Sequence, residues 1–172
     1  LKKETVEDEH GRSRRKSTLI FPRFHQWEAV TTMLAAVREE GAGKSYLIEH
    51  SAGSGKTNTI AWTAHRLLST YGADEQRVFD SVIVVTDRTV LDDQLQEAVR
   101  QIERTSGTVV AVDRKNLGGE ATSKSALVKQ TLLQGNRIIV VTLQTFPAVL
   151  ELLKGDSTLA GRTYAVIADE AH

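Results

Sequence analysis

Residues 50–57, HSAGSGKT, place two glycines, a lysine and a threonine at a spacing that can hold a polyphosphate. Gly53 and Gly55 allow backbone conformations that turn successive N–H groups toward anionic oxygens. Lys56 adds a positive charge for the terminal phosphates, and Thr57 offers a hydroxyl to a magnesium ion. A helix that begins here directs its positive dipole end at the same anion. The stretch therefore predicts a loop for a nucleoside triphosphate. Further backbone contacts would come from Ser51, Ala52 and Ser54.

His50 departs from the general pattern of such loops, which has glycine six positions before the lysine. An alternative interpretation is a glycine-rich turn that only joins a strand to a helix. The nucleotide loop is favoured because a strand is expected before it, a helix after it, and the GKT triplet stands where the chemistry needs it.

The second group with chemical potential is VIADEAH, residues 166–172. Asp169 follows an apolar run and is placed to hold a magnesium ion, while Glu170 beside it can polarise an attacking water. Neighbouring acids are more often simply solvated, so this pair alone is a weak signal. Together with Lys56 it predicts a catalytic set of Lys56, Asp169 and Glu170.

From residue 19 onward, segments with a helical hydrophobic pattern alternate with short apolar runs typical of strands, and these elements must position the residues above. Helical stripes occupy 24–41, the segment after the glycine loop to about 72, and the segments around 89–104, 124–134 and 145–154. Short apolar runs predict strands at 45–50, 81–87, 108–112, 137–142 and 163–169. This order predicts an α/β fold with a mostly parallel sheet and helices on both faces. The polar clusters HSAGSGKT, TDRT, TLQT and DEAH would then meet at the carboxyl edge of the sheet.

Composition sets wider limits on the class of protein. The chain has 172 residues, 40% hydrophobic and 26% charged, which is ordinary for one globular domain. Lys and Arg number 22, as do Asp and Glu, so any surface for a polyanion must be local. With no cysteine there is no disulfide framework or thiolate metal site. No apolar run reaches the ~20 residues that cross a bilayer, and no signal-peptide pattern is present, so we expect a cytoplasmic protein without a membrane partner.

The amino-terminal stretch differs from the rest of the chain. Residues 1–18 are almost wholly polar, and we interpret them as a linker or arm, with residues 19–172 forming the domain. A basic run at Arg12, Arg14, Arg15 and Lys16 could touch phosphates, but a solvated linker is the simpler interpretation. We expect the sequence to be a piece of a longer protein.

Four motifs in order give a family resemblance. HSAGSGKT, VIVVTDRTVLDDQL, VVTLQTF and VIADEAH resemble motifs I, Ia, Ic and II of superfamily 2 helicases and translocases. FPRFHQWEAV, HSAGSGKTNTIAW and VIVVTDRTVLDDQL are also similar to the R subunit, the motor subunit of type I restriction enzymes. The resemblance covers about residues 19–172. It implies a RecA-like P-loop domain that binds ATP and Mg²⁺.

The resemblance also implies residue roles. Gln26 would recognise the adenine edge, with Phe21 or Phe24 stacking on the base. The alternative is that such polar residues near a helix start cap the helix or contact solvent. His172 would link the nucleotide state to a partner domain. Contacts to the sugar-phosphate backbone of double-stranded DNA would come from Thr86, Asp87, Arg88, Thr142, Gln144 and Thr145. Alternatively, Thr86, Thr89, Thr142 and Thr145 cap the helices that follow them.

The expected function is the first motor domain of an ATP-driven double-stranded DNA translocase in a type I restriction complex. Its partners would be methylation and specificity subunits and a second RecA-like domain of the same chain, which supplies an arginine to the ATP site. Two alternatives stay open: another superfamily 2 DNA or RNA helicase, and a P-loop nucleotide-binding module that moves nothing. The 172 residues alone are expected to bind ATP weakly and to hydrolyse it negligibly.

Overall fold

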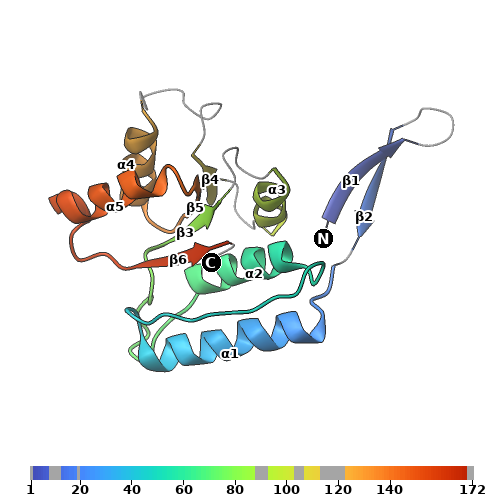
Figure 1. Ribbon diagram of the computed structural model, residues 1–172, viewed down its shortest axis with the longest axis horizontal. Coiled ribbons are helices and arrows are strands. Elements are labelled where there is room, and N and C mark those ends of the chain that lie inside the picture. The colour runs from blue at the N-terminus through green and yellow to red at the C-terminus, as the bar shows by residue number, and fades with distance from the viewer. Residues whose placement is uncertain are drawn as a thin grey trace.

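A computed structural model of the chain describes residues 2–7, 13–18, 20–87, 93–102, 107–112 and 123–169 (Figure 1). Its centre is a four-stranded sheet in the order β4-β5-β3-β6. The strands are β3 (Ser81–Thr86), β4 (Val109–Ala111), β5 (Ile138–Thr142) and β6 (Tyr164–Ala168). Every pair of neighbours in this sheet is parallel, so the carboxyl ends of the strands lie along one edge.

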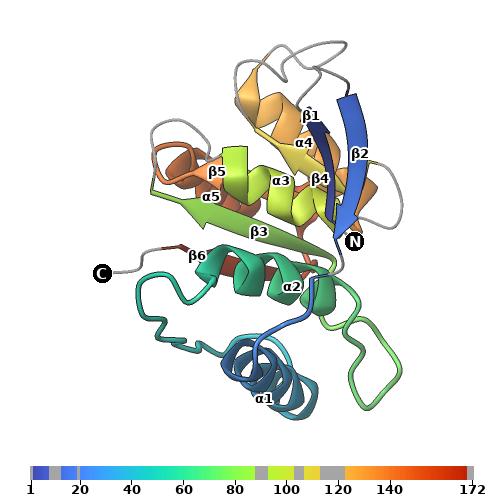
Figure 2. The same ribbon diagram turned by 90° about the vertical axis from the view of Figure 1, so that its right-hand side faces the viewer.

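Helices cover both faces of the sheet, as the sequence predicts. The helices are α1 (Phe24–Glu40), α2 (Lys56–Leu68), α3 (Asp93–Gln101), α4 (Lys124–Gln134) and α5 (Phe146–Gly155), followed by the short 3-10 helix η1 (Ser157–Leu159). In Figure 1 the sheet lies between α4 and α5 above and α1 and α2 below, and Figure 2 shows the same layers from the side.

Alternation along the central strands explains the two layers. Val82 and Val84 of β3 pack in one buried cluster with α1, α2 and α3. Ile83 and Val85, which point to the opposite face, pack with α4, α5 and η1. Every residue of β3 and β5 is buried, as expected for strands covered on both sides. The predicted α/β fold with helices on both faces is confirmed.

The helical stripes that the sequence predicts lie on the buried faces. In α1, Val30, Leu34 and Val37 are buried, and the helix ends at Gly41, whose φ is +73° and whose N–H donates to the carbonyl of Val37. In α2 the buried stripe contains Ile60, Ala64, Leu67 and Leu68. Within the described residues no helix is long and apolar enough to cross a membrane.

The strand predicted at residues 45–50 is wrong. This segment has no regular secondary structure, and Leu47 within it is 77% exposed. A cavity of about 1220 Å³ lies between residues 43–51 on one side and residues 164–169 of the sheet edge on the other. A strand forms only when its backbone groups find a partner, and here the cavity separates the segment from β6.

The amino-terminal arm contains strands that the sequence did not predict. β1 (Lys2–Glu7) and β2 (Ser13–Thr18) pair antiparallel, from Lys2 opposite Thr18 to Glu7 opposite Ser13. In Figure 1 this hairpin projects away from the sheet. Pairing of this kind joins backbone groups and needs no apolar side chains, which is why the polar composition gave no signal for it. The boundary at residue 18 stays a prediction, and of the basic run Arg12 lies outside the described residues.

Candidate nucleotide-binding site

The glycine loop has the backbone shape that the nucleotide prediction requires. Gly53 and Gly55 both have positive φ, +72° and +88°, in the region that glycine enters most easily. Gly55 is the N-cap of α2, and its left-handed conformation turns the chain directly into the helix at Lys56. No side chain caps α2, so the positive end of the helix dipole is not covered by a side-chain oxygen. Ser51, Ala52 and Gly53 are exposed on the loop.

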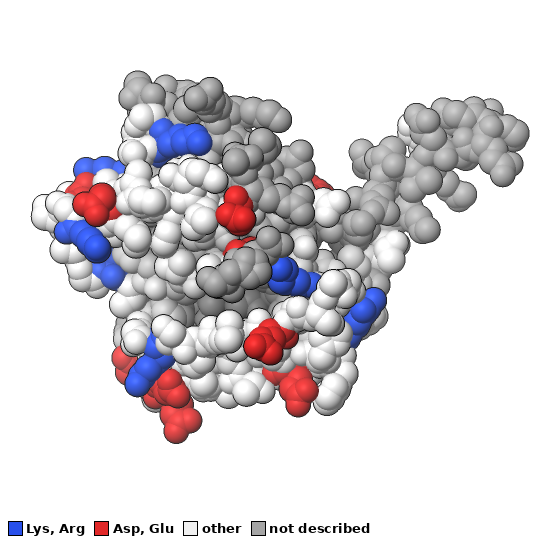
Figure 3. Space-filling view, in the orientation of Figure 1, with Lys and Arg blue, Asp and Glu red and all other residues white. Residues whose placement is uncertain are grey.

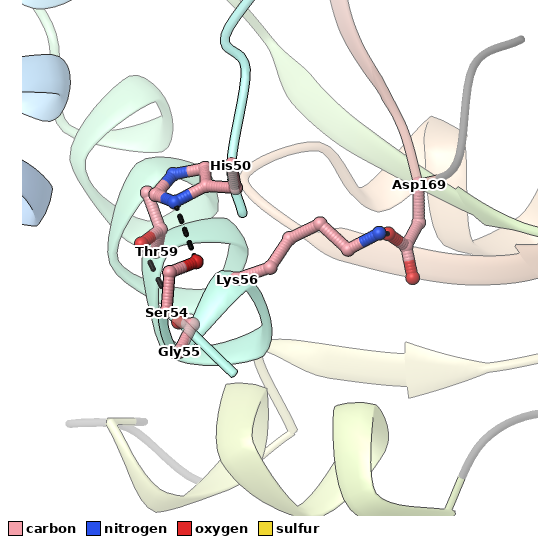
Figure 4. A network of polar contacts seen from close by, with 6 residues as sticks. All are labelled: His50, Ser54, Gly55, Lys56, Thr59 and Asp169. Carbon is pink, nitrogen blue, oxygen red and sulfur yellow. Dashed lines mark hydrogen bonds and ion pairs between the residues drawn. The ribbon is translucent and has the colours of Figure 1, made fainter. Parts of the chain in front are cut away.

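Lys56 and Asp169 meet at this loop, although they lie far apart in the sequence. The Nζ atom of Lys56 is 3.1 Å from Oδ1 of Asp169 (Figure 4). Lys56 is the first residue of α2, and Asp169 follows the last residue of β6. The backbone N–H of Asp169 donates to the carbonyl of Val85 at 2.8 Å, which ties the acid to the sheet. The predicted convergence of the amine and the acid is confirmed.

The carboxylate oxygen of this ion pair makes no hydrogen bond. Oδ1 of Asp169 is buried and accepts no hydrogen bond, so its contact with Lys56 is a close pair of charges without directed hydrogen-bond geometry. A buried carboxylate oxygen without a hydrogen bond is unusual in a folded protein. Oδ1 of Asp169 is thus held by the ion pair with Lys56, and a metal cation could take the place of the ammonium group there.

The residues present fit a magnesium ion held together with phosphates. Thr57, the second residue of α2, is partly buried beside Lys56, and its hydroxyl and the Asp169 carboxylate are hard oxygen ligands. Among the described residues no group of three or more His, Cys, Asp or Glu could hold a metal by itself. Mg²⁺ in phosphate sites commonly takes only one or two protein ligands, so this set is sufficient. Glu170, the predicted activator of water, lies outside the described residues.

Ser54, between the two glycines, is held by contacts from α1 and from the start of the loop. Its carbonyl oxygen lies 3.1 Å from Nε2 of His25 and accepts from Nε2 of Gln26 at 3.2 Å. Its hydroxyl lies 3.0 Å from Nδ1 of His50, as Figure 4 shows. These contacts tie the nucleotide loop to the first turn of α1.

Gln26 uses its whole amide on the protein. Its Oε1 accepts from the N–H of Arg23, the N-cap of α1, at 2.8 Å, which confirms the alternative that Gln26 caps its own helix. Its Nε2 also donates to the carbonyl of Gly55 at 2.9 Å, and the side chain is only 3% exposed. Adenine recognition by Gln26 stays a prediction. Phe21 and Phe24, the predicted stacking residues, are exposed, and so is Trp27, which the sequence analysis did not single out.

His50 takes the place of the expected glycine and has a perturbed environment. Burial lowers the pKa of His50, and the nearby His25 and Lys56 lower it further. The rings of His25 and His50 meet edge to face with centroids 5.8 Å apart. A His with a lowered pKa is neutral at pH 7, so it can bond Ser54 without adding charge to the loop. The departure from glycine was the only sequence signal for this role.

Thr86 of the TDRT cluster and Thr142 of the TLQT cluster lie side by side, as the prediction of a shared carboxyl edge requires. Thr86 and Thr142 are opposite each other at the ends of β3 and β5, and both are buried. The N–H of Leu143 donates to the carbonyl of Thr86 at 2.8 Å, which joins the two clusters directly. Asp87 and Gln144 beside them are exposed. Their contact with DNA stays a prediction, and Arg88, Thr89 and His172 lie outside the described residues.

The geometry at Thr145 bears on the alternative that this threonine caps the helix that follows it. Thr145 is the N-cap of α5, yet its side chain makes no capping hydrogen bond. Its hydroxyl instead lies 3.0 Å from the hydroxyl of Thr142. The two threonines therefore form a hydroxyl pair at the carboxyl edge of the sheet.

Charge on the face shown in Figure 3 is mixed, with basic and acidic side chains interspersed. This agrees with the equal counts of the two signs in the sequence. On this face, the described residues form no broad basic surface, so a nucleic-acid contact there would rest on few groups.

Comparison with known proteins adds the family. The family model for the SWI2/SNF2 ATPase matches residues 25–172, from the first turn of α1 through the acidic cluster after β6. No curated protein and no solved structure matches the chain. The matched region contains the glycine loop, Lys56 and Asp169 in the arrangement described above, and it supports a superfamily 2 motor domain with a RecA-like fold. The chain thus belongs to the SWI2/SNF2 ATPase family.

Proposed function

We propose that the chain is the first of two RecA-like domains in an ATP-dependent translocase on double-stranded DNA. We further propose that this translocase is the motor subunit of a type I restriction endonuclease, acting with methylation and specificity subunits. The observation that carries the ATP site is the convergence of Lys56 and Asp169 at the glycine loop. The restriction assignment is supported by the resemblance of residues 21–30, 50–62 and 82–95 to the R subunit.

The proposed chemistry divides among the residues of the loop and the sheet edge. The backbone from Ser51 to Gly55 cradles the phosphates, and Lys56 leaves the Asp169 carboxylate to bind the terminal phosphate oxygens. Thr57 and Asp169 hold Mg²⁺, which neutralises charge on the phosphates when it is bound. Glu170 accepts a proton from the attacking water.

The proposed track contact uses the hydroxyl-rich edge next to the ATP site. Thr86 and Thr142 end adjacent strands, and Thr142 is paired with Thr145. Hydroxyls and backbone amides bind phosphate and sugar without reading bases, which suits a motor that moves along any sequence. Thr86 and Thr142 belong to the same sheet that positions Asp169. A structural change at the nucleotide site can therefore be transmitted through this sheet to the proposed DNA contact.

A second domain is needed for fast hydrolysis in this proposal. An arginine supplied to the γ-phosphate is worth about 10³–10⁵ in rate. The 172-residue chain should therefore bind ATP but hydrolyse it at least about 10³-fold more slowly than the two-domain protein. Rapid, DNA-stimulated hydrolysis by the 172 residues alone would contradict this division of labour.

The decisive experiment uses the full-length natural protein on duplex DNA. ATP-dependent displacement of a third DNA strand from a duplex reports translocation, and RNA serves as the competing track. Lys56→Ala should abolish displacement. The matched control is Lys154→Ala, an exposed lysine on α5 across the sheet, which should leave displacement unchanged.

The outcomes separate the candidate functions. Displacement on duplex DNA together with co-purification of methylation and specificity subunits supports the full proposal. Translocation without those subunits, or stimulation by RNA, identifies another superfamily 2 motor. Nucleotide binding without any translocation identifies a P-loop binding module.

A further inference from the structure

Ser54 is bonded through its N–H, its carbonyl and its hydroxyl, although it lies in the middle of a glycine-rich loop. Its N–H donates to the carbonyl of Ser51 at 3.2 Å. Its carbonyl oxygen accepts from Nε2 of Gln26 at 3.2 Å and lies 3.1 Å from Nε2 of His25. Its hydroxyl lies 3.0 Å from Nδ1 of His50 (Figure 4), and the residue is only 8% exposed. The protein itself therefore fixes Ser54 in place.

The two neighbours of Ser54 are residues that need such fixing. Gly53 and Gly55 hold positive φ angles of +72° and +88°. Glycine enters this region easily, but it enters many other regions as well. Fixing a backbone in one conformation costs conformational entropy, and glycine loses more of it than any other residue. Contacts that already hold Ser54 remove part of this cost from nucleotide binding.

The hydrogen-bond pattern identifies which ring nitrogen of His50 carries the proton. Nε2 of His50 is buried and has no hydrogen-bond partner, whereas Nδ1 lies beside the Ser54 hydroxyl. Burial lowers the pKa of His50, as do the nearby His25 and Lys56, so the ring is neutral at pH 7 and has a single N–H. A buried N–H without an acceptor is rarer in folded proteins than an acceptor without a donor. The proton is therefore on Nδ1, which donates it to Oγ of Ser54.

His25 bonds the other end of Ser54 and packs against His50. A carbonyl oxygen can only accept, so Nε2 of His25 donates to the carbonyl of Ser54. The rings of His25 and His50 meet edge to face with centroids 5.8 Å apart, an arrangement that aromatic pairs favour. His50 thus bonds the hydroxyl of Ser54 and supports the ring that bonds its carbonyl. Glycine, the general residue at this position of such loops, has no side chain for either contact.

We propose that His50 is a positioning residue for ATP, which acts through Ser54 to hold the nucleotide loop in its phosphate-binding shape before ATP binds. This inference rests on the proposed ATP site at Lys56 and Asp169. His50 itself makes no contact with the nucleotide. ATP meets a loop whose glycines are already ordered, so less of the interaction energy is lost to ordering the loop.

A second histidine provides a matched control at the far end of α2. Nε2 of His65 lies 2.7 Å from the carbonyl of Val99 in α3. This contact joins two helices and does not involve the nucleotide loop. His65→Ala and His50→Ala each remove one imidazole ring and one hydrogen bond to another part of the chain. His65→Ala therefore measures how far a general loss of stability affects ATP binding.

Calorimetric titration of the full-length natural protein with ATP and Mg²⁺ tests the proposal. His50→Ala should weaken binding about 10-fold, near the upper limit for one hydrogen bond because loop order is lost as well. The side-chain nitrogen of asparagine is as many bonds from Cα as Nδ1 of histidine, so His50→Asn should bind ATP within about 3-fold of wild type. His65→Ala should change the affinity less than about 2-fold. A loss below about 3-fold in His50→Ala, or an equal loss in His50→Asn, would overturn the proposal.

A double-mutant cycle tests whether His50 acts through Ser54. Ser54→Ala removes the hydroxyl and keeps the carbonyl that His25 and Gln26 bond. In the Ser54→Ala background, His50→Ala should weaken ATP binding less than about 3-fold, because its main partner is already absent. A full 10-fold loss, to within about 2-fold, in that background would show that His50 acts on the nucleotide by another route and would overturn the proposal.

NMR of the nucleotide-free protein tests the hydrogen bond and the loop order directly. With ¹⁵N-labelled histidine side chains above pH 7, the proton of His50 should be on Nδ1 and that of His25 on Nε2. A His50 proton on Nε2 would overturn the proposal. Backbone order parameters of Gly53 and Gly55 should fall in His50→Ala and stay at the wild-type value in His65→Ala. Unchanged order in His50→Ala would contradict the positioning role.

Lys56→Ala separates failure of this inference from failure of the proposed ATP site. If Lys56→Ala and His50→Ala both leave ATP affinity unchanged, the site is wrong and the inference falls with it. If Lys56→Ala weakens ATP binding at least about 10-fold and His50→Ala does not weaken it, the site stands and only the positioning role is overturned.

Discussion

Substitution of Gly55 tests how tightly the nucleotide loop is held against α1. Gly55 has a φ of +88°, and a Cβ added there would lie 2.5 Å from Nε2 of Gln26. Gly53 also has a positive φ, +72°, but an added Cβ would meet no atom within 4 Å. Gly53→Ala is therefore a matched control, because it shares the backbone strain of Gly55→Ala without the collision.

The two substitutions differ by the contacts of Gln26. A left-handed backbone conformation costs a non-glycine residue about 1–2 kcal/mol, so each variant should lose about that much free energy of unfolding. Gly55→Ala must also displace the Gln26 amide from the carbonyls of Gly55 and Ser54, which it reaches at 2.9 and 3.2 Å. Two hydrogen bonds at about 0.5–1.5 kcal/mol each add about 1–3 kcal/mol. The expected free-energy losses are about 2–5 kcal/mol for Gly55→Ala and about 1–2 kcal/mol for Gly53→Ala.

Urea unfolding followed by far-UV circular dichroism at 25 °C measures both losses. A Gln26→Ala background provides the second control, since without the amide Gly55→Ala should cost only about 1–2 kcal/mol. If Gly55→Ala and Gly53→Ala are equally destabilising, Gln26 does not hold the loop. If the additional loss persists in the Gln26→Ala background, its cause lies elsewhere.

Two further predictions concern pH. Because the pKa of His50 is lowered from 6.5, the native state binds fewer protons than the unfolded state, and stability should fall as pH drops below 6.5. His50→Asn should reduce this fall in urea unfolding from pH 7.5 to 5.5; an unchanged pH profile would exclude His50 as its source. Hydrogen bonds from Lys129 and Thr158 hold the pKa of Asp156 at about 2 instead of 3.8, so its contribution to stability is present above pH 3.8 and is lost as pH falls toward 2. Lys129→Met should raise the Asp156 pKa in a carboxyl NMR titration and weaken this loss, and a pKa that stays near 2 would show that Lys129 is not the main cause.

Most of the fold can be predicted from the hydrophobic periods. The runs at 81–86 and 138–142 contain consecutive β-branched residues, and in the structure they form strands buried on both faces. The segment at 45–50 has a similar pattern but lacks a partner, because strand formation depends on an adjacent edge as well as on composition. The hairpin of β1 and β2 was not predicted because its sequence is polar and lacks a hydrophobic pattern. Its strands are paired through their backbones, and the hydrophobic pattern does not report such pairing.

The contacts of the candidate site also include some that could be predicted from sequence and some that could not. Lys56 and Asp169 could be brought together from sequence, because parallel strands end at one edge and the glycine loop opens a helix at that edge. The contacts of His25 and Gln26 with the loop could not be predicted, since they depend on how α1 packs against α2. Spacing along the chain carries no information on that packing.

The central claim is that Lys56 and Asp169 share one metal-chelated polyphosphate. Calorimetric titration of the 172-residue chain with ATP, with and without Mg²⁺, tests it most directly when wild type, Lys56→Ala, Asp169→Asn and the double variant are compared. We predict that Lys56→Ala weakens binding at least about 10-fold, that Asp169→Asn removes the gain from Mg²⁺, and that the two losses are not additive. ATP affinity that is unchanged by Lys56→Ala, or a gain from Mg²⁺ that survives Asp169→Asn, would contradict the account.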